Sequence, residues 1–199
     1  MCRAGRKGDL SRAALSCMSN PQNFGDLAFT PAVKAVQERL GTRRNYVRLE
    51  GRAVRTAIGP DEAEFIAARD SFYIATVGEN GWPYMQYRGG PKGFLRMLAA
   101  TTLGFADFRG NGQYVSTGNV LSTHHACLFL MDYPNQTRLK IWAEAEISED
   151  AATIARVIDP SYPAQVERAF LFHVQAFDWN CQKYIAQRFT REEFEALSV

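Results

Sequence analysis

At 199 residues, the chain has the length of one domain and is long enough to bury a sizeable core. Its hydrophobic and charged fractions, 46% and 22%, exclude a disordered chain, and no apolar run is long enough to span a membrane. The net charge of +2 is unevenly spread, because residues 1–60 hold eleven Lys and Arg against four Asp and Glu, whereas the rest holds twelve against seventeen.

The basic start of the chain predicts an N-terminal arm, residues 1–24, ahead of a single domain of residues 25–199. Such an arm can contact nucleic acid or an anionic surface, but no nucleic-acid motif accompanies it, so a solvated flank or a partner-subunit contact is favoured. Residues 1–17 lack the apolar segment of a signal peptide, and we expect Met18 to be the natural start. The cysteines show neither metal-site spacing nor disulfide density, which indicates reduced thiols in a cytoplasm: Cys2, Cys17, Cys127 and Cys181.

Two helices are predicted in the first third. Thr30 and Pro31 supply a hydroxyl N-cap and a proline at the first helical position, and Gly41 follows the end of that helix. A second helix begins at Pro60 and runs through Arg69, with acidic residues in its first turn. Residues 43–55, between the two, are basic and are expected to be irregular.

A β-hairpin is predicted over residues 71–90. Residues 72–77 and 82–88 have extended patterns, and Gly78-Glu79-Asn80-Gly81 between them tolerates positive φ. A period of two places Gln86 and Arg88 on one face of the second strand, with Trp82 and Tyr84. An amide and a guanidinium side by side on an apolar ribbon indicate a polar ligand.

The remaining chain reads mainly as strands. Extended patterns cover residues 93–98, 102–108, 126–131, 138–147 and 168–177; a helix is expected over 150–158; and Thr190 to Glu193 form a capping box before a short C-terminal helix. The loop Gly110-Asn111-Gly112-Gln113 offers free backbone donors to an anion. The fold class is therefore mainly β with peripheral helices, in a closed or nearly closed antiparallel barrel.

Common nucleotide, metalloprotease and esterase motifs are missing: GxGxxG, GxxxxGK[ST], HExxH and GxSxG. The segments IATVGENGWPYMQYRGGPKGF, LGFADFRGNGQYVSTGN, LFLMDYPNQTRLKI and FDWNCQKYIAQRF instead resemble the FMN-binding split-barrel family related to pyridoxamine 5'-phosphate oxidase. The resemblance runs over residues 25–190 and is greatest to oxidase-related flavoproteins of unassigned substrate. It implies an antiparallel split β-barrel of the FMN-binding type.

The resemblance also implies a homodimer with FMN in a cleft between the two barrels. The residues that it assigns to the cofactor come from the second strand of the hairpin, the 107–113 segment, the 138–147 strand and the C-terminal segment: Gln86, Tyr87, Arg88, Asp107, Arg109, Gly110, Asn111, Gln113, Arg138, Trp179, Asn180, Gln182 and Arg188. Arginine binds phosphate in bidentate fashion and glutamine can both donate to and accept from a flavin ring, so their chemistry agrees.

Two departures argue against genuine pyridoxamine phosphate oxidase activity. The family's Ser-Arg-Lys run is replaced by Gly110-Asn111-Gly112, and the C-terminal segment has a different sequence. The implied activity is flavin-dependent oxidation or reduction of an unidentified small molecule, with no acid or base assigned. The alternative is a non-catalytic flavin or haem binding and sequestering protein on the same barrel. His124, His125 and His173 are interpreted as residues with local hydrogen bonds, with axial haem ligation as a remote option.

Overall fold

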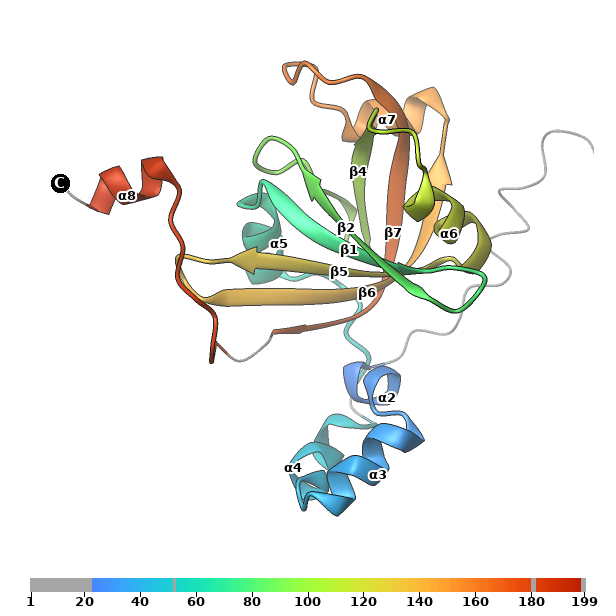
Figure 1. The fold of residues 1–199 in the computed structure, drawn as a ribbon, viewed down its shortest axis with the longest axis vertical. Helices are drawn as coiled ribbons and strands as arrows, with labels where there is room; N and C mark the ends of the chain where they lie inside the picture. The colour runs from blue at the N-terminus through green and yellow to red at the C-terminus, as the bar shows by residue number, and fades with distance from the viewer. Residues whose placement is uncertain (1–22, 52, 180–181, 198–199) are drawn as a thin grey trace, which may run out of the picture.

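The computed structural model describes residues 23–51, 53–179 and 182–197. Figure 1 shows a curled sheet with helices at its periphery. The helices are α2 (Phe24–Ala28), α3 (Pro31–Arg39), α4 (Arg43–Tyr46), the 3-10 turn η2 (Val47–Leu49), α5 (Pro60–Ala67), α6 (Val115–Thr123), α7 (Ala151–Val157) and α8 (Arg191–Leu197). The strands are β1 (Ser71–Val77), β2 (Pro83–Gly89), β3 (Arg96–Ala99), β4 (Thr102–Phe108), β5 (His125–Asp132), β6 (Thr137–Ser148) and β7 (Val166–Trp179).

All seven strands form one antiparallel sheet in the order β2-β1-β5-β6-β7-β4-β3. This confirms the predicted mainly β class with peripheral helices and an antiparallel barrel of the split type. The sheet curls until its two halves share a core, since the ring of Phe72 on β1 contacts the ring of Phe105 on β4 at 5.4 Å. Phe105 also stacks on Phe170 of β7, with ring centroids 5.1 Å apart.

The predicted strand alternation is confirmed in β2 and β6. Leu139, Ile141 and Ala145 of β6 are buried in the core, whereas the intervening residues are half-buried. In β2, Tyr84, Gln86 and Arg88 are less exposed than their neighbours, and the opposite residues point outward. The face that a side chain takes therefore follows from the period of two.

Helix ends with strong capping signals were predicted well. The Thr30 side chain accepts from the Val33 amide at the start of α3. Before α8, Thr190 and Glu193 form both bonds of the capping box. Two predictions were wrong: residues 43–49 are not irregular but form α4 and η2, and α6 lies where no helix was expected.

Residues 23–51 form a helical module that projects from the barrel (Figure 1). Phe24 attaches it to the sheet, with its ring 5.3 Å from that of Trp142. Glu50 joins its helices, since the carboxylate accepts from Lys34 at 2.9 Å and from Arg43 at 2.5 Å. Of the predicted arm, residues 1–24, only the last two lie within the described residues.

Residues 182–197 form a C-terminal arm that leaves the barrel at the β5–β6 turn. The Gln136 side chain donates to the Ile185 carbonyl at 2.6 Å, and the Gln187 side chain donates to the Pro134 carbonyl at 2.8 Å. Beyond this anchor, α8 extends away from the barrel (Figure 1). Among the described residues, no helix has the length and apolar character needed to cross a membrane.

Candidate functional site

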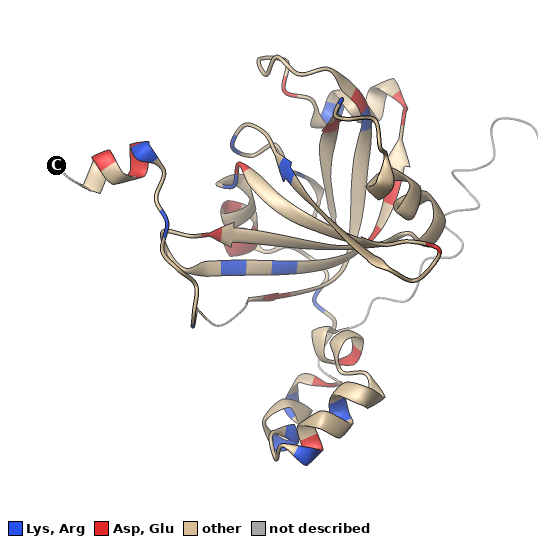
Figure 2. Ribbon diagram, viewed as in Figure 1, with Lys and Arg blue, Asp and Glu red and all other residues tan. Residues whose placement is uncertain are grey.

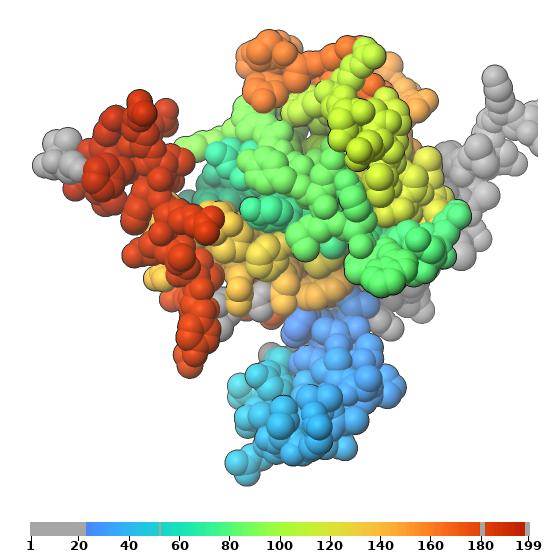
Figure 3. Space-filling view, in the orientation of Figure 1, coloured from blue at the N-terminus to red at the C-terminus, as the bar shows by residue number. Residues whose placement is uncertain are grey.

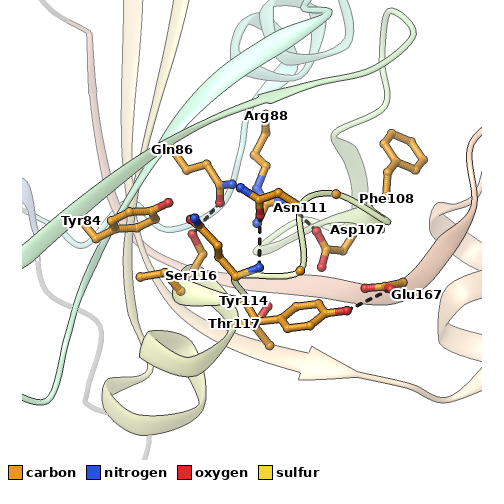
Figure 4. A pocket seen from close by; sticks show the side chains of 14 residues that line it. Tyr84, Gln86, Arg88, Asp107, Phe108, Asn111, Tyr114, Ser116, Thr117 and Glu167 are labelled. Carbon is orange, nitrogen blue, oxygen red and sulfur yellow. Dashed lines mark hydrogen bonds and ion pairs between the residues drawn. The ribbon is translucent and has the colours of Figure 1, made fainter.

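A pocket opens between β2, the segment that follows β4, the start of α6 and β7, and Figure 4 shows its side chains. Its cavity volume is about 220 Å³. It brings together six of the residues that the sequence assigned to the cofactor: Gln86, Arg88, Asp107, Gly110, Asn111 and Gln113. We call it the β2–α6 pocket.

The inward face of β2 forms one wall of this pocket. Gln86 accepts a hydrogen bond from the Ser116 hydroxyl at 2.9 Å, which links β2 to α6 (Figure 4). Tyr84, on the same face of the strand, also lines the cavity. The wall is therefore held in place by a bond between a strand and a helix.

A charged network forms the floor. Arg88 donates to Asp107 at 2.7 Å, and the Arg168 Nε lies 3.6 Å from the other Asp107 oxygen. Burial raises the pKa of Asp107, although the positive charges of Arg88 and Arg168 oppose the rise. The guanidinium of Arg88 also lies over the rings of Phe105 and Phe170, at 5.5 and 5.3 Å. Arg88 is thus fixed inside the barrel and is no longer a free surface cation.

One buried donor of this network has no partner. The Nε of Arg88 is shielded from solvent and makes no hydrogen bond within the described chain. Because a buried unpaired donor costs about 1–3 kcal/mol, it favours an acceptor in the adjoining cavity. The Nε of Arg168 is also buried and makes no hydrogen bond within the described chain, although it lies 3.6 Å from an Asp107 oxygen.

The loop before α6 completes the pocket. Asn111 accepts from the Gln113 amide at 3.1 Å, which holds the loop in a tight turn (Figure 4). Tyr114 then adopts the left-handed region, with φ of 51°, and its hydroxyl donates to Glu167 at 3.2 Å. Non-glycine residues in that region are strained and gather at functional sites. Ser116 and Thr117, both buried, lie in the first turn of α6, where the free amides of a helix start favour an anion.

Three other predicted residues lie on the opposite side of the sheet. Tyr87 is 60% exposed, and its ring contacts that of Tyr73 at 5.7 Å. Arg138 lies over the ring of Phe129, and Arg188 lies over that of Tyr133. A hydrogen bond with Tyr73 raises the pKa of Tyr133, so these side chains share one surface. We call this surface, formed by β1, β2 and β5 and their neighbours, the outer face.

The outer face is apolar at its centre. A shallow cavity of about 410 Å³ is lined by Tyr73, Ala75, Met85, Cys127 and Phe129, and Met85 is 67% exposed. Burial raises the pKa of the Cys127 thiol, which keeps it protonated. An exposed apolar surface of this kind is typical of a protein interface.

The structure brings neither Trp179 nor Gln182 to the pocket. Trp179 closes the end of the barrel, where its indole donates to the buried Glu62 carboxylate at 2.9 Å and its ring contacts Phe65 at 4.8 Å. Gln182 is exposed on the C-terminal arm. Arg109 does not line the pocket either, and its guanidinium donates to the Gln165 side chain at 3.3 Å in an exposed position. Asn180 lies outside the described residues.

Sequence reasoning missed part of the pocket. Tyr114, Ser116 and Thr117 come from a helix that was not expected, and Glu167 and Arg168 come from β7. No pattern in the sequence singled out Arg168, because its strand also carries Glu167, His173, Gln175 and Asp178. The pairing of that strand with β4, which places Arg168 opposite Asp107, is a tertiary feature.

Comparison with solved structures places the fold among known proteins. HupZ of Group A Streptococcus matches with a TM-score of 0.52 and 14% identity, over 66% of this chain and 99% of that one. A putative pyridoxamine 5'-phosphate oxidase from Lactobacillus delbrueckii (TM-score 0.49, 16% identity) covers 62% and 95%, and an FMN-binding protein from Syntrophomonas wolfei (0.49, 13%) covers 75% and 97%. No curated protein matches the sequence.

The family follows from a profile match. The profile described as pyridoxamine 5'-phosphate oxidase matches residues 58–178, which is more than half of the chain and includes every strand except the last residue of β7. The matched region begins after the helical module and ends before the C-terminal arm. The barrel and the β2–α6 pocket therefore lie within the matched region, and the chain belongs to the pyridoxamine 5'-phosphate oxidase family.

Proposed function

We propose that the protein binds FMN, with the phosphate end of the cofactor in the β2–α6 pocket. The observation that carries this proposal is the shape of the pocket, which gathers an inward arginine, two hydroxyls and the start of a helix around one cavity. Hydroxyls and helix-terminal amides are typical phosphate donors, and a buried arginine supplies positive charge. The family resemblance independently assigns FMN to residues from the same segments.

The size of the pocket fits part of the cofactor. Sites that enclose a whole ligand of this class measure about 300–1,000 Å³, and this cavity measures about 220 Å³. The phosphate and sugar-alcohol chain would occupy it, and the flavin ring would lie outside. The Arg88 Nε, buried and without a partner, is the donor that a phosphate oxygen would satisfy.

The flavin ring would lie at the edge of β2, against a second copy of the chain. β2 is an edge strand, so Gln86 on its inner face and Tyr87 on its outer face are only one residue apart across that edge. The outer face offers flat groups, Tyr87 and Tyr73, with the cations Arg138 and Arg188 nearby. Pairing two outer faces would bury this surface, which supports a homodimer with the cofactor at its interface.

The proposed activity is a two-electron oxidation or reduction of a small molecule. FMN supplies the hydride chemistry when bound, and the protein binds, orients and shields it. The two carboxylates that line the pocket, Asp107 and Glu167, are both engaged by Arg168, so neither is placed as a proton donor or acceptor. The small molecule would have to approach from the side of the flavin ring.

The second candidate is a non-catalytic flavin or haem binding protein. The engagement of both pocket carboxylates favours it, because binding needs no proton transfer whereas many redox reactions do. Anaerobic addition of a reduced nicotinamide separates the candidates: bleaching of the bound flavin within seconds supports the oxidoreductase, and an unchanged spectrum supports the binder. A Soret band in the absorption spectrum of the purified protein would indicate that the bound group is haem and not FMN.

Removal of one hydroxyl tests whether the β2–α6 pocket binds the phosphate. Ser116→Ala removes a buried hydroxyl from the pocket together with its bond to the Gln86 side chain, which holds the β2 wall, and FMN affinity in a fluorescence titration is expected to fall about tenfold. Ser122→Ala, on the exposed part of the same helix, is the matched control. Equal affinities for the two variants would remove α6 from the site.

A further inference from the structure

The charges of the β2–α6 pocket balance one another before any ligand enters it. The pocket lies at the junction of the β1–β2 hairpin with α6, which Figure 3 shows from outside in green and yellow-green. Its lining and floor hold two guanidinium groups and two carboxylates, each carboxylate paired with an arginine: Arg88, Arg168, Asp107 and Glu167. Figure 2 shows both signs of charge together where the end of β4 meets the start of β7. These four groups sum to zero, so a phosphate dianion would bring two negative charges in excess of the positive charge that they supply.

Glu167 is held as an anion by its neighbours. The Arg168 guanidinium lies 2.6 Å from its carboxylate, the Tyr114 hydroxyl donates to it at 3.2 Å, and the Arg109 Nε lies 3.9 Å away. Donors and cations beside a carboxylate favour its charged form. The Arg109 side chain is itself 64% exposed, so solvent screens its charge from the pocket. Glu167 is therefore not the group that we expect to change its protonation when an anion binds.

Asp107 is the carboxylate that a bound phosphate would approach. Its side chain is only 5% exposed and lines the cavity. Arg88 donates to it through Nη1 at 2.7 Å, and the buried, unpartnered Nε of the same guanidinium is the donor that a phosphate oxygen would satisfy. A single guanidinium would then separate the phosphate from the carboxylate, and two negative groups so close together away from water disfavour each other's charge. Burial already raises the pKa of Asp107, and a phosphate would raise this pKa further.

The charged groups of β3 and α7, which also pack against β4, lie on the far side of that strand. β3 carries Arg96, which is paired with Gly104, and α7 carries Arg156 and packs against Ala106. Gly104 and Ala106 share one face of β4, and Asp107 lies on the opposite face because side chains alternate along a strand. Within the described chain, neither element therefore brings a charge to the Asp107 carboxylate.

We infer that the pocket binds the FMN phosphate together with one proton, which Asp107 holds in the complex at neutral pH. This coupling rests on the FMN site proposed above and makes its affinity depend on pH. On binding, a solvent proton forms the O–H bond of a neutral Asp107 carboxyl group; no bond of the cofactor breaks, and the proton takes no part in the redox reaction. Because the complex holds one more proton than the separate partners, FMN binds more tightly as pH falls.

Calorimetric titration of FMN into the full chain, freed of cofactor, counts the proton. The titration is run at about pH 7.5, where the phosphate of free FMN is a dianion because its second pKa is about 6. In buffers of different ionisation enthalpy, the observed heat should report uptake of about one proton per FMN. The dissociation constant should rise about tenfold per pH unit between about pH 6.5 and 7.5. Riboflavin, which lacks the phosphate, should bind without proton uptake.

An isosteric variant assigns the proton to its carboxylate. Asp107→Asn is neutral at every pH, so it should bind FMN with no proton uptake and with a dissociation constant that does not change over the same pH range. Glu64→Gln, at an exposed position on α5, is the matched control and should behave as the wild type. Uptake that persists in Asp107→Asn, or that is also lost in Glu64→Gln, would overturn the assignment to Asp107.

Phosphorus NMR of the wild-type complex makes the same test if Asp107→Asn does not fold. The bound phosphate should keep the chemical shift of a dianion over this pH range, because the proton is on the protein; the shift of a monoanion would place the proton on the ligand and overturn the coupling. FMN that binds without proton uptake would overturn the coupling alone. A chain that does not bind FMN, or that binds FMN and riboflavin equally, would overturn the phosphate pocket as well.

Discussion

Two different roles have been assigned to Trp179, one from the family resemblance and one from its contacts in the structure. The resemblance places it beside the flavin, whereas the structure places its indole against Glu62, a carboxylate that is only 5% exposed. In this position it supplies a donor to a buried acceptor and covers the end of the barrel beside Phe65. Its contacts within one chain are structural, and a contact with the partner's cofactor stays a proposal.

A Trp179→Phe variant separates these roles. Phenylalanine keeps a ring against Phe65 but removes the donor to Glu62, so the free energy of unfolding in urea is expected to fall by about 1–3 kcal/mol. FMN affinity should not change. A weaker affinity at unchanged stability would return Trp179 to the cofactor site.

At the scale of elements, α6 is a helix that its own sequence does not favour. It contains Gly118 and β-branched residues, and it begins and ends at left-handed residues, Tyr114 and His124. Its position is set by tertiary bonds: Ser116 to Gln86, Asn119 to Thr76 and Thr123 to the Val77 carbonyl. This explains why the sequence did not predict it.

Two glycines give opposite predictions on substitution by alanine. A Cβ at Gly118 would meet open space, and Gly118→Ala is expected to raise the unfolding free energy by about 0.5–1 kcal/mol and increase Tm. A Cβ at Gly25 would lie 2.5 Å from the Leu49 carbonyl oxygen, a backbone atom that cannot move aside easily.

Gly25→Ala should therefore loosen the helical module, at a cost of about 1–3 kcal/mol. Amide hydrogen exchange measures this locally, and the amides of α2 and η2 should exchange faster while those of β6 remain protected. Uniformly faster exchange across both regions would mean that the module and barrel unfold together.

Local signals account for what the sequence predicted among the elements. The caps of α3 and α8, the faces of β2 and the alternation of β6 depend on neighbours within four residues, and all are confirmed. The division of the predicted cofactor residues between the pocket and the outer face depends on how the sheet curls. No local sequence pattern encodes this curvature of the sheet.

At the scale of the whole molecule, Asp107 joins two distant parts of the sheet. It lies on β4, next to one edge, and bonds Arg88 on β2, which is the other edge. Asp107→Asn removes the carboxylate that Arg88 and Arg168 share, and it replaces a group that can ionise with one that stays neutral at every pH.

The pH dependence of this variant has a defined sign. Because the folded-state pKa of Asp107 is raised, its protonated form favours folding: this contribution is fully present below the unfolded pKa of about 3.9 and is lost as pH rises through the folded value. The difference in unfolding free energy between wild type and Asp107→Asn should fall as pH rises through that window. A difference in unfolding free energy that stays constant with pH would contradict the raised pKa of Asp107.

The Arg88–Asp107 contact joins β2 to β4 along a seam of the barrel, and this seam also affects the order in which the barrel folds. Hairpins such as β1–β2 and β5–β6 join residues close in sequence, but the seam needs both ends of a seven-stranded order to arrive together. We expect it to close late, after the transition state. An anion seated across it would then leave the refolding rate almost unchanged and slow the unfolding rate instead, so the cofactor would lengthen the lifetime of the native barrel.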